Sequence, residues 1–142
     1  MKRLLPLLLL VAAGASAQEF RARVAEVHNG NTISIQEPGR RGTEIVRLEG
    51  VSVPGRWRPF AAKSRESLRA LVKYKQVTIV PRSADRYGRL TATVLIDGLD
   101  VGLEQIRRGL AWYEPEGHDL ADYEAAEADA ERERRGLWAE RR

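Results

Sequence analysis

Trp57 lies between two arginines, Arg56 and Arg58, in a segment rich in proline and glycine. An indole ring can stack on a nucleic-acid base while guanidinium groups hold the adjacent phosphates. The same ring could instead pack against the body of the protein, because large aromatic side chains are usually buried. Both interpretations of Trp57 stay open at the level of sequence.

Few other side chains could do chemistry. The chain has no cysteine, which excludes disulfides, thiolate metal sites and cysteine nucleophiles. Its two histidines, His28 and His118, are far apart in sequence, so a histidine-ligated zinc site is not expected. Any catalysis must therefore use carboxylates, hydroxyls, a histidine or a bound ion.

The charge of the chain is unevenly distributed. The 142 residues carry a formal net charge of +4. Residues 18–113 hold 17 basic and 10 acidic side chains, a net +7, whereas residues 114–142 hold 5 basic and 10 acidic ones. A basic body is typical of a phosphate-binding surface, although a charge excess that serves solubility gives the same pattern.

The N-terminus has the layout of a secretory signal peptide. Two basic residues precede an apolar run over residues 4–13, and the small residues 15–17 suit a cleavage site. The run is shorter than the roughly 20 residues of a membrane-spanning helix. We therefore expect a signal peptide over residues 1–17, and a single exported domain over residues 18–142, periplasmic or secreted, with no membrane segment in the mature form.

Periodicity predicts the elements that must position these side chains. Three strands are expected between Phe20 and Leu48, and the Asn29-Gly30 pair predicts a type I′ hairpin turn, which needs positive φ at both residues. The other expected elements are strands over 77–80 and 91–96, a helix that begins at Pro59, a short helix over 101–110, and a helix from about Asp119 to Arg135.

This order of elements indicates an α+β fold. Five strands arranged in this way can close into a Greek-key barrel of the oligonucleotide-binding (OB) kind, capped by helices.

Four blocks of the sequence, in this order, resemble the staphylococcal nuclease (thermonuclease) family. They are Val-His-Asn-Gly-Asn-Thr at 27–32, Val-Arg-Leu-Glu-Gly-Val-Ser-Val-Pro at 46–54, Asp-Arg-Tyr-Gly-Arg at 85–89, and residues 101–112 together with 136–138. The resemblance covers about residues 20–140. It implies a five-stranded barrel with three helices, and a calcium-dependent phosphodiesterase that cuts DNA and RNA.

The resemblance also implies which residues form the site. The two catalytic arginines of the family, which clamp the phosphate and its developing charge, correspond to Arg47 and Arg89. Arg86 and Tyr87 resemble residues that contact the nucleotide phosphate. The expected phosphate-binding or nucleic-acid-binding set is therefore Arg47, Arg86, Tyr87 and Arg89.

Three positions depart from the family pattern. Asn31 and Ser52 stand where the family has two calcium-binding aspartates, and Gly55 stands where it has the glutamate taken as the general base. Losing two carboxylates removes the charges that compensate a dication. A like charge at roughly 5 Å costs about 3 kcal/mol at an effective dielectric constant near 20. We therefore expect neither calcium nor another cofactor at this site.

Other side chains could rebuild a metal site, and four are candidates: Glu44, Glu49, Asp85 and His28. Glu49 lies two residues after Arg47, on the same side of an expected strand. A simple salt bridge between Glu49 and Arg47 is the alternative interpretation.

The leading hypothesis is an exported nuclease-like domain, a pseudoenzyme, that has lost calcium-dependent phosphodiesterase activity. It would keep an arginine-lined pocket for nucleic acid or a phosphorylated nucleotide. One alternative is an active endonuclease that hydrolyses DNA or RNA phosphodiesters with a rearranged metal site. A second is a structural or protein-interaction module on an inherited barrel, although no feature of the sequence identifies a protein partner.

Overall fold

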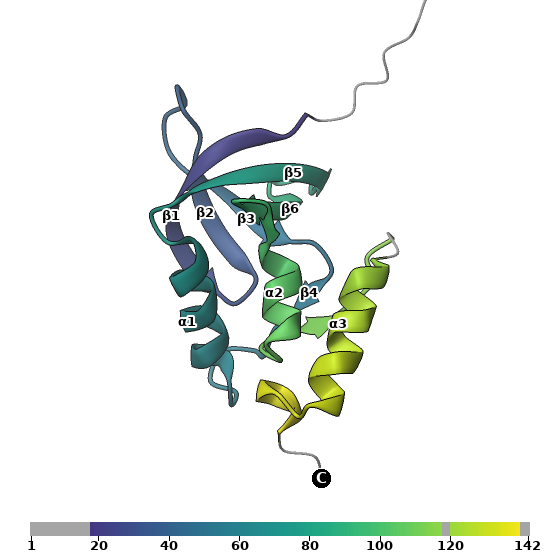
Figure 1. Cartoon of the computed structure of the whole chain (residues 1–142). Coiled ribbons are helices and arrows are strands. Elements are labelled where there is room, and N and C mark those ends of the chain that lie inside the picture. Colours follow the sequence, from purple (N-terminus) through teal and green to yellow (C-terminus); the bar gives the residue numbers. More distant parts are fainter. Residues whose placement is uncertain (1–17, 118–119, 140–142) are drawn as a thin grey trace, which may run out of the picture.

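Five strands form a closed barrel in the computed structural model, which describes residues 18–117 and 120–139 (Figure 1). They are β1 (Phe20–Asn29), β2 (Thr32–Gln36), β3 (Glu44–Leu48), β5 (Gln76–Ala84) and β6 (Leu90–Ile96). The strand order is β3-β2-β1-β5-β6, with antiparallel neighbours, and a parallel pairing of β3 with β6 closes the barrel. The predicted α+β fold with a five-stranded OB barrel is therefore confirmed.

Three helices accompany the barrel, as the family resemblance implies. They are α1 (Ala61–Val72), α2 (Val101–Arg107) and α3 (Ala121–Arg132), and a short 3₁₀ helix η1 (Gly136–Trp138) follows them. The remaining strands are short: β4 (Val51–Ser52) pairs with β8 (Trp112–Tyr113), and β7 (Leu99–Asp100) pairs with the end of β6. The expected signal peptide, His118 and the Asp119 helix start lie outside the described residues.

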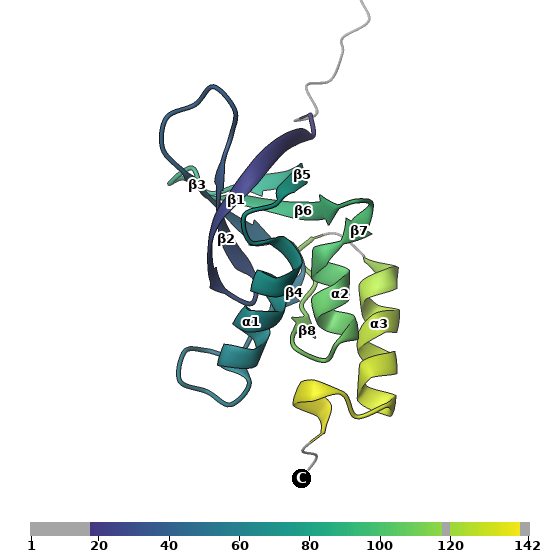
Figure 2. The ribbon, with the colours of Figure 1, turned by 60° about the vertical axis from the view of Figure 1, so that its left-hand side comes forward.

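The helices gather on one side of the barrel, and α2 stands between α1 and α3 (Figure 1, Figure 2). Gly102 allows the close contact of α2 with α3, because a Cβ there would lie 2.8 Å from the hydroxyl of Tyr123. That hydroxyl donates a hydrogen bond of 2.7 Å to Asp100. Burial and the neighbouring Asp100 charge raise the pKa of Tyr123, which keeps the donor protonated.

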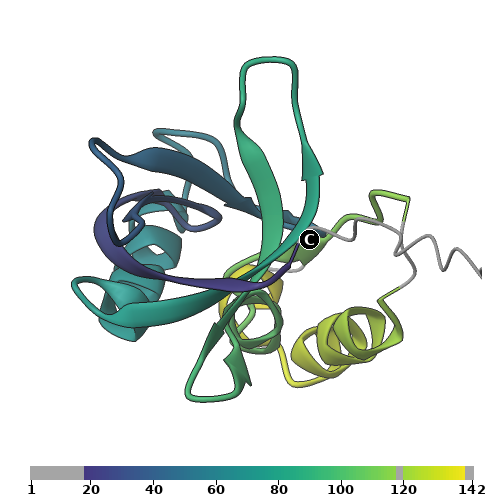
Figure 3. The same cartoon turned by 90° about the horizontal axis from the view of Figure 1, so that it is seen from above.

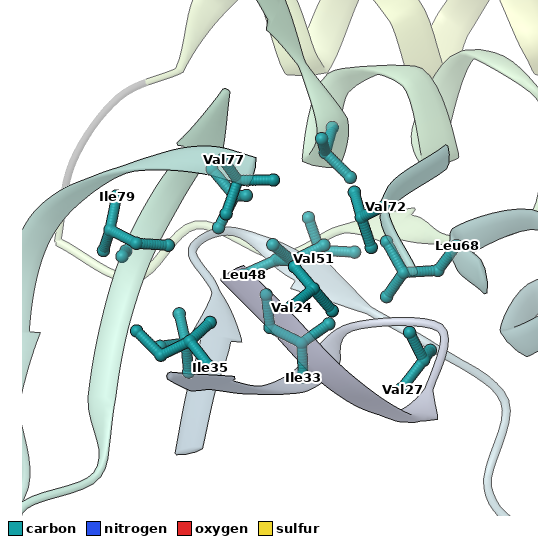
Figure 4. Packing of buried hydrophobic residues seen from close by; sticks show 14 of the residues in the cluster. Val24, Val27, Ile33, Ile35, Leu48, Val51, Leu68, Val72, Val77 and Ile79 are labelled. Atoms are coloured by element: carbon teal, nitrogen blue, oxygen red, sulfur yellow. The ribbon is translucent and has the colours of Figure 1, made fainter. Parts of the chain in front are cut away.

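The core lies inside the barrel and beneath α1. Figure 4 shows Val24, Ile33 and Leu48 from the barrel meeting Leu68 and Val72 from α1, and each of these residues is at most 1% exposed. Alternation along β1 is interrupted where a register shift separates Val24 from Glu26. Such a bulge bends a strand, which helps a small sheet to close on itself.

The first hairpin turn differs from the prediction. Strand β1 runs through Asn29, which pairs with Thr32, so the two turn residues are Gly30 and Asn31. None of the turn residues has a positive φ, so the turn is not type I′. Gly30 is instead needed for close packing, because a Cβ at that position would lie 1.8 Å from Oγ of Ser64 on α1.

Gly30→Ala is expected to lower the free energy of unfolding by about 1–3 kcal/mol, because the added methyl group must push Ser64 and α1 away. Urea denaturation measures the change. Gly55→Ala is the matched control, because a Cβ at Gly55 comes no closer than 4.0 Å to Arg58 and should change stability by less than about 0.5 kcal/mol. Equal losses in the two variants would contradict the packing role of Gly30.

Within the described residues, no helix has the length and apolar character needed to cross a lipid bilayer.

Candidate nucleic-acid interface

A cleft of about 800 Å³ lies where the β1–β2 turn, the loop after β4 and the start of α1 meet. Its walls include all three positions that depart from the family pattern, Asn31, Ser52 and Gly55. Asn31 is distant in sequence from the other two, and the barrel brings it to them because β4 lies beside the first turn: the Asn31 side chain donates a hydrogen bond to the carbonyl of Val51. The predicted grouping of these three positions is thus a property of the folded chain.

The cleft is basic. Three arginines line it, Arg56, Arg58 and Arg65, and among the described residues no aspartate or glutamate does. His28 also lines it, with its Nε2 atom 2.6 Å from Oγ of Ser34. The first turn of α1, which begins at the cleft, contains no acidic residue. Arg65 also has a long ion pair with Glu66, at 3.9 Å. Guanidinium groups gathered in a concave site raise the local concentration of anions, so the cleft suits an anionic ligand.

Asn31 uses its side-chain amide to tie the hairpin turn to the segment after it. Its Nδ2 donates to the backbone carbonyl of Val51 over 2.8 Å, and its Oδ1 accepts from the Thr32 hydroxyl over 2.9 Å. An aspartate could not donate the first of these bonds. The amide therefore stabilises the local backbone at this position.

Ser52 and Gly55 supply little else for a cation. Ser52 lies on β4 opposite Trp112, and its side chain is half-buried. Gly55 has no side chain, and the nearest side-chain atom to a Cβ built there is Cγ of Arg58 at 4.0 Å. At Gly55, where the family has its general base, the chain therefore has no side chain, and the edge of the cleft is open there.

Arg47, on β3, makes an ion pair with Glu116 in the segment after β8. The distance from Nη2 to Oε1 is 2.6 Å, and the two side chains are 40% and 28% exposed. Arg47 is close to the cleft through the backbone, because the amide of Leu48 donates to the carbonyl of Asn31 over 2.8 Å. Arg47 thus lies on the outer side of β3, next to the cleft, and its guanidinium group is already paired with the Glu116 carboxylate.

Arg89 lies at the end of a hairpin that projects away from the barrel between β5 and β6 (Figure 3). Its Nε donates to Asp85 over 2.7 Å, and the same carboxylate accepts from the backbone amides of Tyr87 and Arg89, each at 2.9 Å. Partial burial alone would raise the pKa of Asp85, but these hydrogen bonds lower it below its usual value. The ionised Asp85 therefore joins the backbone and the Arg89 side chain at the tip of the hairpin.

Tyr87 is presented to solvent at this tip. Its ring is 70% exposed and lies between two guanidinium groups, with Arg86 at 5.0 Å and Arg89 at 5.5 Å from its centroid. An aromatic face flanked by cations can receive a base and a phosphate together. The structure therefore brings Arg86, Tyr87 and Arg89 together, as expected.

Arg47 lies on β3, and Arg89 lies just before β6, the strand that pairs with β3. In the parallel β3–β6 pairing Arg47 is opposite Thr91, two residues after Arg89. Strands lie about 4.8 Å apart and rise about 3.3 Å per residue, so the two Cα atoms are on the order of 8 Å apart. On β3, alternation directs Arg47 outward, away from buried Val46 and Leu48. Arg89 lies in the hairpin, where its Nε donates to Asp85.

The profile of the staphylococcal nuclease homologues matches residues 41–140. The chain belongs to the staphylococcal nuclease family. The block that departs at Ser52 and Gly55 and the block that carries Arg89 both lie within the matched residues. The resemblance inferred from the sequence is thus confirmed.

Several relatives are described as nucleases. A protein of Haemophilus influenzae, described as an uncharacterized endonuclease, is 31% identical over 135 residues, which cover 94% of this chain and 75% of the relative. An uncharacterized endonuclease of Escherichia coli O157:H7 is 28% identical over 142 residues, covering 99% and 92%. A probable staphylococcal-like nuclease of Oryza sativa subsp. japonica is 29% identical over 110 residues, covering 73% of this chain and 33% of the relative.

The donor set of this staphylococcal nuclease homologue does not fit the calcium ion of the family. Calcium takes six to eight oxygen ligands and depends on charged ones. The polar side chains of the cleft are neutral or basic: two amides, of Asn29 and Asn31, that are both bonded to the backbone, the hydroxyl of Ser52, the imidazole of His28, and three arginines. In the part of the chain that the structure describes, no three histidine, aspartate or glutamate side chains are grouped so as to hold a metal.

The four candidates for a rebuilt metal site have other contacts in this family member. Each contact joins the candidate to a polar side chain: Glu44 with Arg40 at 3.0 Å, Glu49 with Arg82 at 3.2 Å, Asp85 with Arg89 at 2.7 Å, and His28 with Ser34 at 2.6 Å. The ion pair of Glu49 with Arg82 differs from the expected bridge to Arg47, because Glu49 follows the end of β3 and is buried, 2% exposed.

Two residues of the interface were missed by sequence reasoning. Arg65 lines the cleft from α1, and its position four residues after Ala61, on the polar side of the expected helix, was a usable signal. Glu116 is 69 positions from its partner Arg47, and no local pattern points to that pair. The first could have been found from the sequence, whereas the second depends on the fold.

Glu116→Gln is expected to strengthen binding of a single-stranded oligonucleotide about 2- to 5-fold, because it removes the carboxylate that competes for Arg47 and exposed ion pairs contribute about 0.2–1 kcal/mol. Fluorescence anisotropy at low salt measures the dissociation constant. Glu124→Gln on α3 makes the same change in net charge and is the control. Equal gains in both variants would assign the effect to net charge and contradict a specific role of Glu116.

Proposed function

We propose that the chain binds single-stranded nucleic acid through the outer face of β3 and the β5–β6 hairpin, without calcium-dependent hydrolysis. The observation that carries this proposal is the charge of the site: arginines are present at 47 and 89, while the cleft that adjoins Arg47 has no carboxylate in the part of the chain that the structure describes. Membership of a family whose members include proteins described as nucleases supports a nucleic-acid ligand.

A phosphate can replace the carboxylates that now pair with the two arginines. Both ion pairs are partly exposed, with Arg47 40% and Arg89 61% accessible, and pairs of this kind contribute about 0.2–1 kcal/mol. A charge-assisted hydrogen bond from an arginine to phosphate contributes about 1.5–3 kcal/mol and is often bidentate. Exchange of the carboxylate for a phosphodiester is therefore favourable at each arginine.

Hydrolysis has weaker support in this chain. Phosphodiester cleavage needs an activated nucleophile, and removing a general base alone typically lowers the rate about 10²- to 10⁴-fold. Gly55 offers no base, and the amide of Asn31 is bonded to Val51 and Thr32. This arrangement supports a binding protein over a nuclease, and a nucleotide or oligonucleotide over a metal ion as the ligand.

Export is part of the proposal. The basic start, the apolar run and the small residues at positions 15–17 support secretion into the periplasm or outside the cell. The absence of cysteine is compatible with the periplasm and with the outside of the cell, because the barrel needs no disulfide.

The test uses a labelled 12-nucleotide oligothymidine in anisotropy and gel assays. We expect binding that weakens at least about 20-fold between 50 and 200 mM salt, as three or more phosphate contacts would give, and that is the same with calcium or chelator. We expect no cleavage of this oligonucleotide, plasmid or RNA with calcium, magnesium or manganese. Cleavage abolished by chelator would overturn the proposal in favour of an active endonuclease, and absence of any oligonucleotide binding would favour a protein-interaction module.

A further inference from the structure

Trp57 is exposed to a degree that its packing does not explain. Its side chain is 88% accessible, the highest value among the large hydrophobic residues that the structure describes as exposed. Large aromatic residues are normally buried, because each can remove 150–250 Å² from water. The alternative in which Trp57 packs on the barrel is therefore wrong.

The loop that carries Trp57 has a defined shape. Figure 2 shows this loop just before the start of α1, and backbone hydrogen bonds join Arg58 to Gly55 at 3.0 Å and Ala61 to Arg58 at 3.2 Å. Trp57 and Phe60 have φ angles of 73° and 70°. Bulky residues in this left-handed region cost on the order of 1–3 kcal/mol each, and such strain concentrates at ligand-binding sites.

Trp57 is surrounded by groups that complement a nucleotide. The guanidinium of Arg56 lies 5.0 Å from its ring centroid, and Arg58 and Arg65 line the same cleft. Pro54, Val53, Ala61 and Ala62 add apolar wall between the arginines. An aromatic ring beside several cations and a partly apolar wall is the combination that binds single strands, since the ring stacks on a base and the cations hold the backbone.

We propose that this cleft is a second nucleic-acid subsite, in which Trp57 stacks on a base and Arg58 and Arg65 hold the adjacent phosphates. The inference rests on the proposed function and extends it, since neither Arg47 nor Arg89 lines the cleft. Asn31 lines the cleft and is bonded through its carbonyl to Leu48, next to Arg47, so the two subsites adjoin. A strand longer than a dinucleotide can therefore occupy both.

The ligand class follows from the chemistry of the subsite. A duplex hides its bases in the stack, so an exposed indole gains nothing from it, whereas an unpaired base presents a free face. Stacking tolerates any base, because each has a π-face. The subsite thus selects single-stranded DNA or RNA with little preference for sequence.

The test compares two ligands of equal length and charge, oligothymidine and an abasic oligonucleotide that has the same phosphates but no bases. Trp57→Ala should weaken binding of oligothymidine about 5- to 150-fold and leave binding of the abasic strand unchanged. Trp57→Phe should retain most of the affinity. Arg58→Ala is the matched phosphate variant from the same loop, and it should weaken both ligands equally.

Intrinsic fluorescence supplies a second readout that does not depend on affinity. Stacking of a base on Trp57 should quench the emission of the wild-type protein with oligothymidine and not with the abasic strand, and Trp57→Phe should lose this change. The high exposure of Trp57 means that its variants should keep the wild-type thermal midpoint, which serves as the folding control.

The outcomes separate the inference from the proposed function. If Trp57→Ala binds oligothymidine as tightly as wild type while the wild-type strand binding stays salt-sensitive, the subsite is wrong and the function at Arg47 and Arg89 stands. If Trp57→Ala loses the same affinity for both ligands, Trp57 acts on the loop and not on a base, which also overturns the subsite. If the wild-type protein binds neither strand, both proposals fail.

Discussion

Replacing both Arg47 and Arg89 by alanine is expected to weaken oligonucleotide binding about 100-fold at low salt. Each arginine contributes charge-assisted hydrogen bonds to phosphate of about 1.5–3 kcal/mol. The energy of its present ion pair with a carboxylate, about 0.2–1 kcal/mol, must be subtracted because that pair is broken on binding. The slope of log affinity against log salt should fall by about 1.4, because two fewer counterions are displaced from a single strand. Anisotropy titrations at several salt concentrations measure both quantities.

A matched control removes the same charge elsewhere. Arg40 and Arg41 are exposed in the β2–β3 loop, and Arg40 pairs with Glu37 and Glu44. Replacing Arg40 and Arg41 by alanine changes the net charge by the same two units. Little change in affinity is expected for this control. An equal loss in the control and in the Arg47 and Arg89 variant would show that binding is diffuse and that the proposed site is wrong.

Restoring three carboxylates, through Asn31→Asp, Ser52→Asp and Gly55→Glu, is expected to make the chain respond to calcium. The cleft has room for the third substitution, because a Cβ at Gly55 meets nothing closer than 4.0 Å. Without calcium, Asn31→Asp should destabilise the fold by about 1–3 kcal/mol, because the donor to the Val51 carbonyl is lost. With calcium in excess of its dissociation constant, binding should recover that loss.

Calorimetric titration and thermal unfolding with and without calcium measure this effect, and the wild-type protein should give no calcium response in either. The double variant Asn31→Asp, Ser52→Asp is the control that separates binding from chemistry: it should bind calcium, and adding Gly55→Glu should raise the rate of oligonucleotide cleavage by about 10²- to 10⁴-fold. Calcium binding by the wild-type protein would contradict the account of the cleft given above.

Local patterns were enough for most of the barrel. Alternation over Phe20–Val24 and the apolar faces of the later strands predicted β1, β5 and β6, since each strand has one side toward a common core. The α1 prediction was nearly right in position: the helix begins at Ala61, two residues after Pro59, because Phe60 takes a left-handed conformation. The predicted type I′ turn at Asn29-Gly30 was wrong, because glycine is required at position 30 for close contact with α1 and not for a positive φ.

In the candidate site, too, some features could be predicted from the sequence and others are visible only in the structure. The resemblance to the family implied the missing carboxylates at Asn31, Ser52 and Gly55 and the arginines at 47 and 89, because a departure from a family motif is visible in the sequence. That Asn31 donates to Val51 is visible only in the folded chain, since that bond joins residues 20 positions apart.

The sequence by itself determined the family, the barrel, and the loss of negative charge where the family has three acids. The tertiary structure decided which side chains pair: Arg47 with Glu116, and Glu49 with Arg82. It also decided that Trp57 is exposed to solvent at the edge of an arginine-lined cleft. The physical reason is the sequence separation over which each kind of interaction acts. Strand and helix patterns arise from neighbours within a few residues, whereas ion pairs and exposure depend on which distant segments the closed barrel brings together.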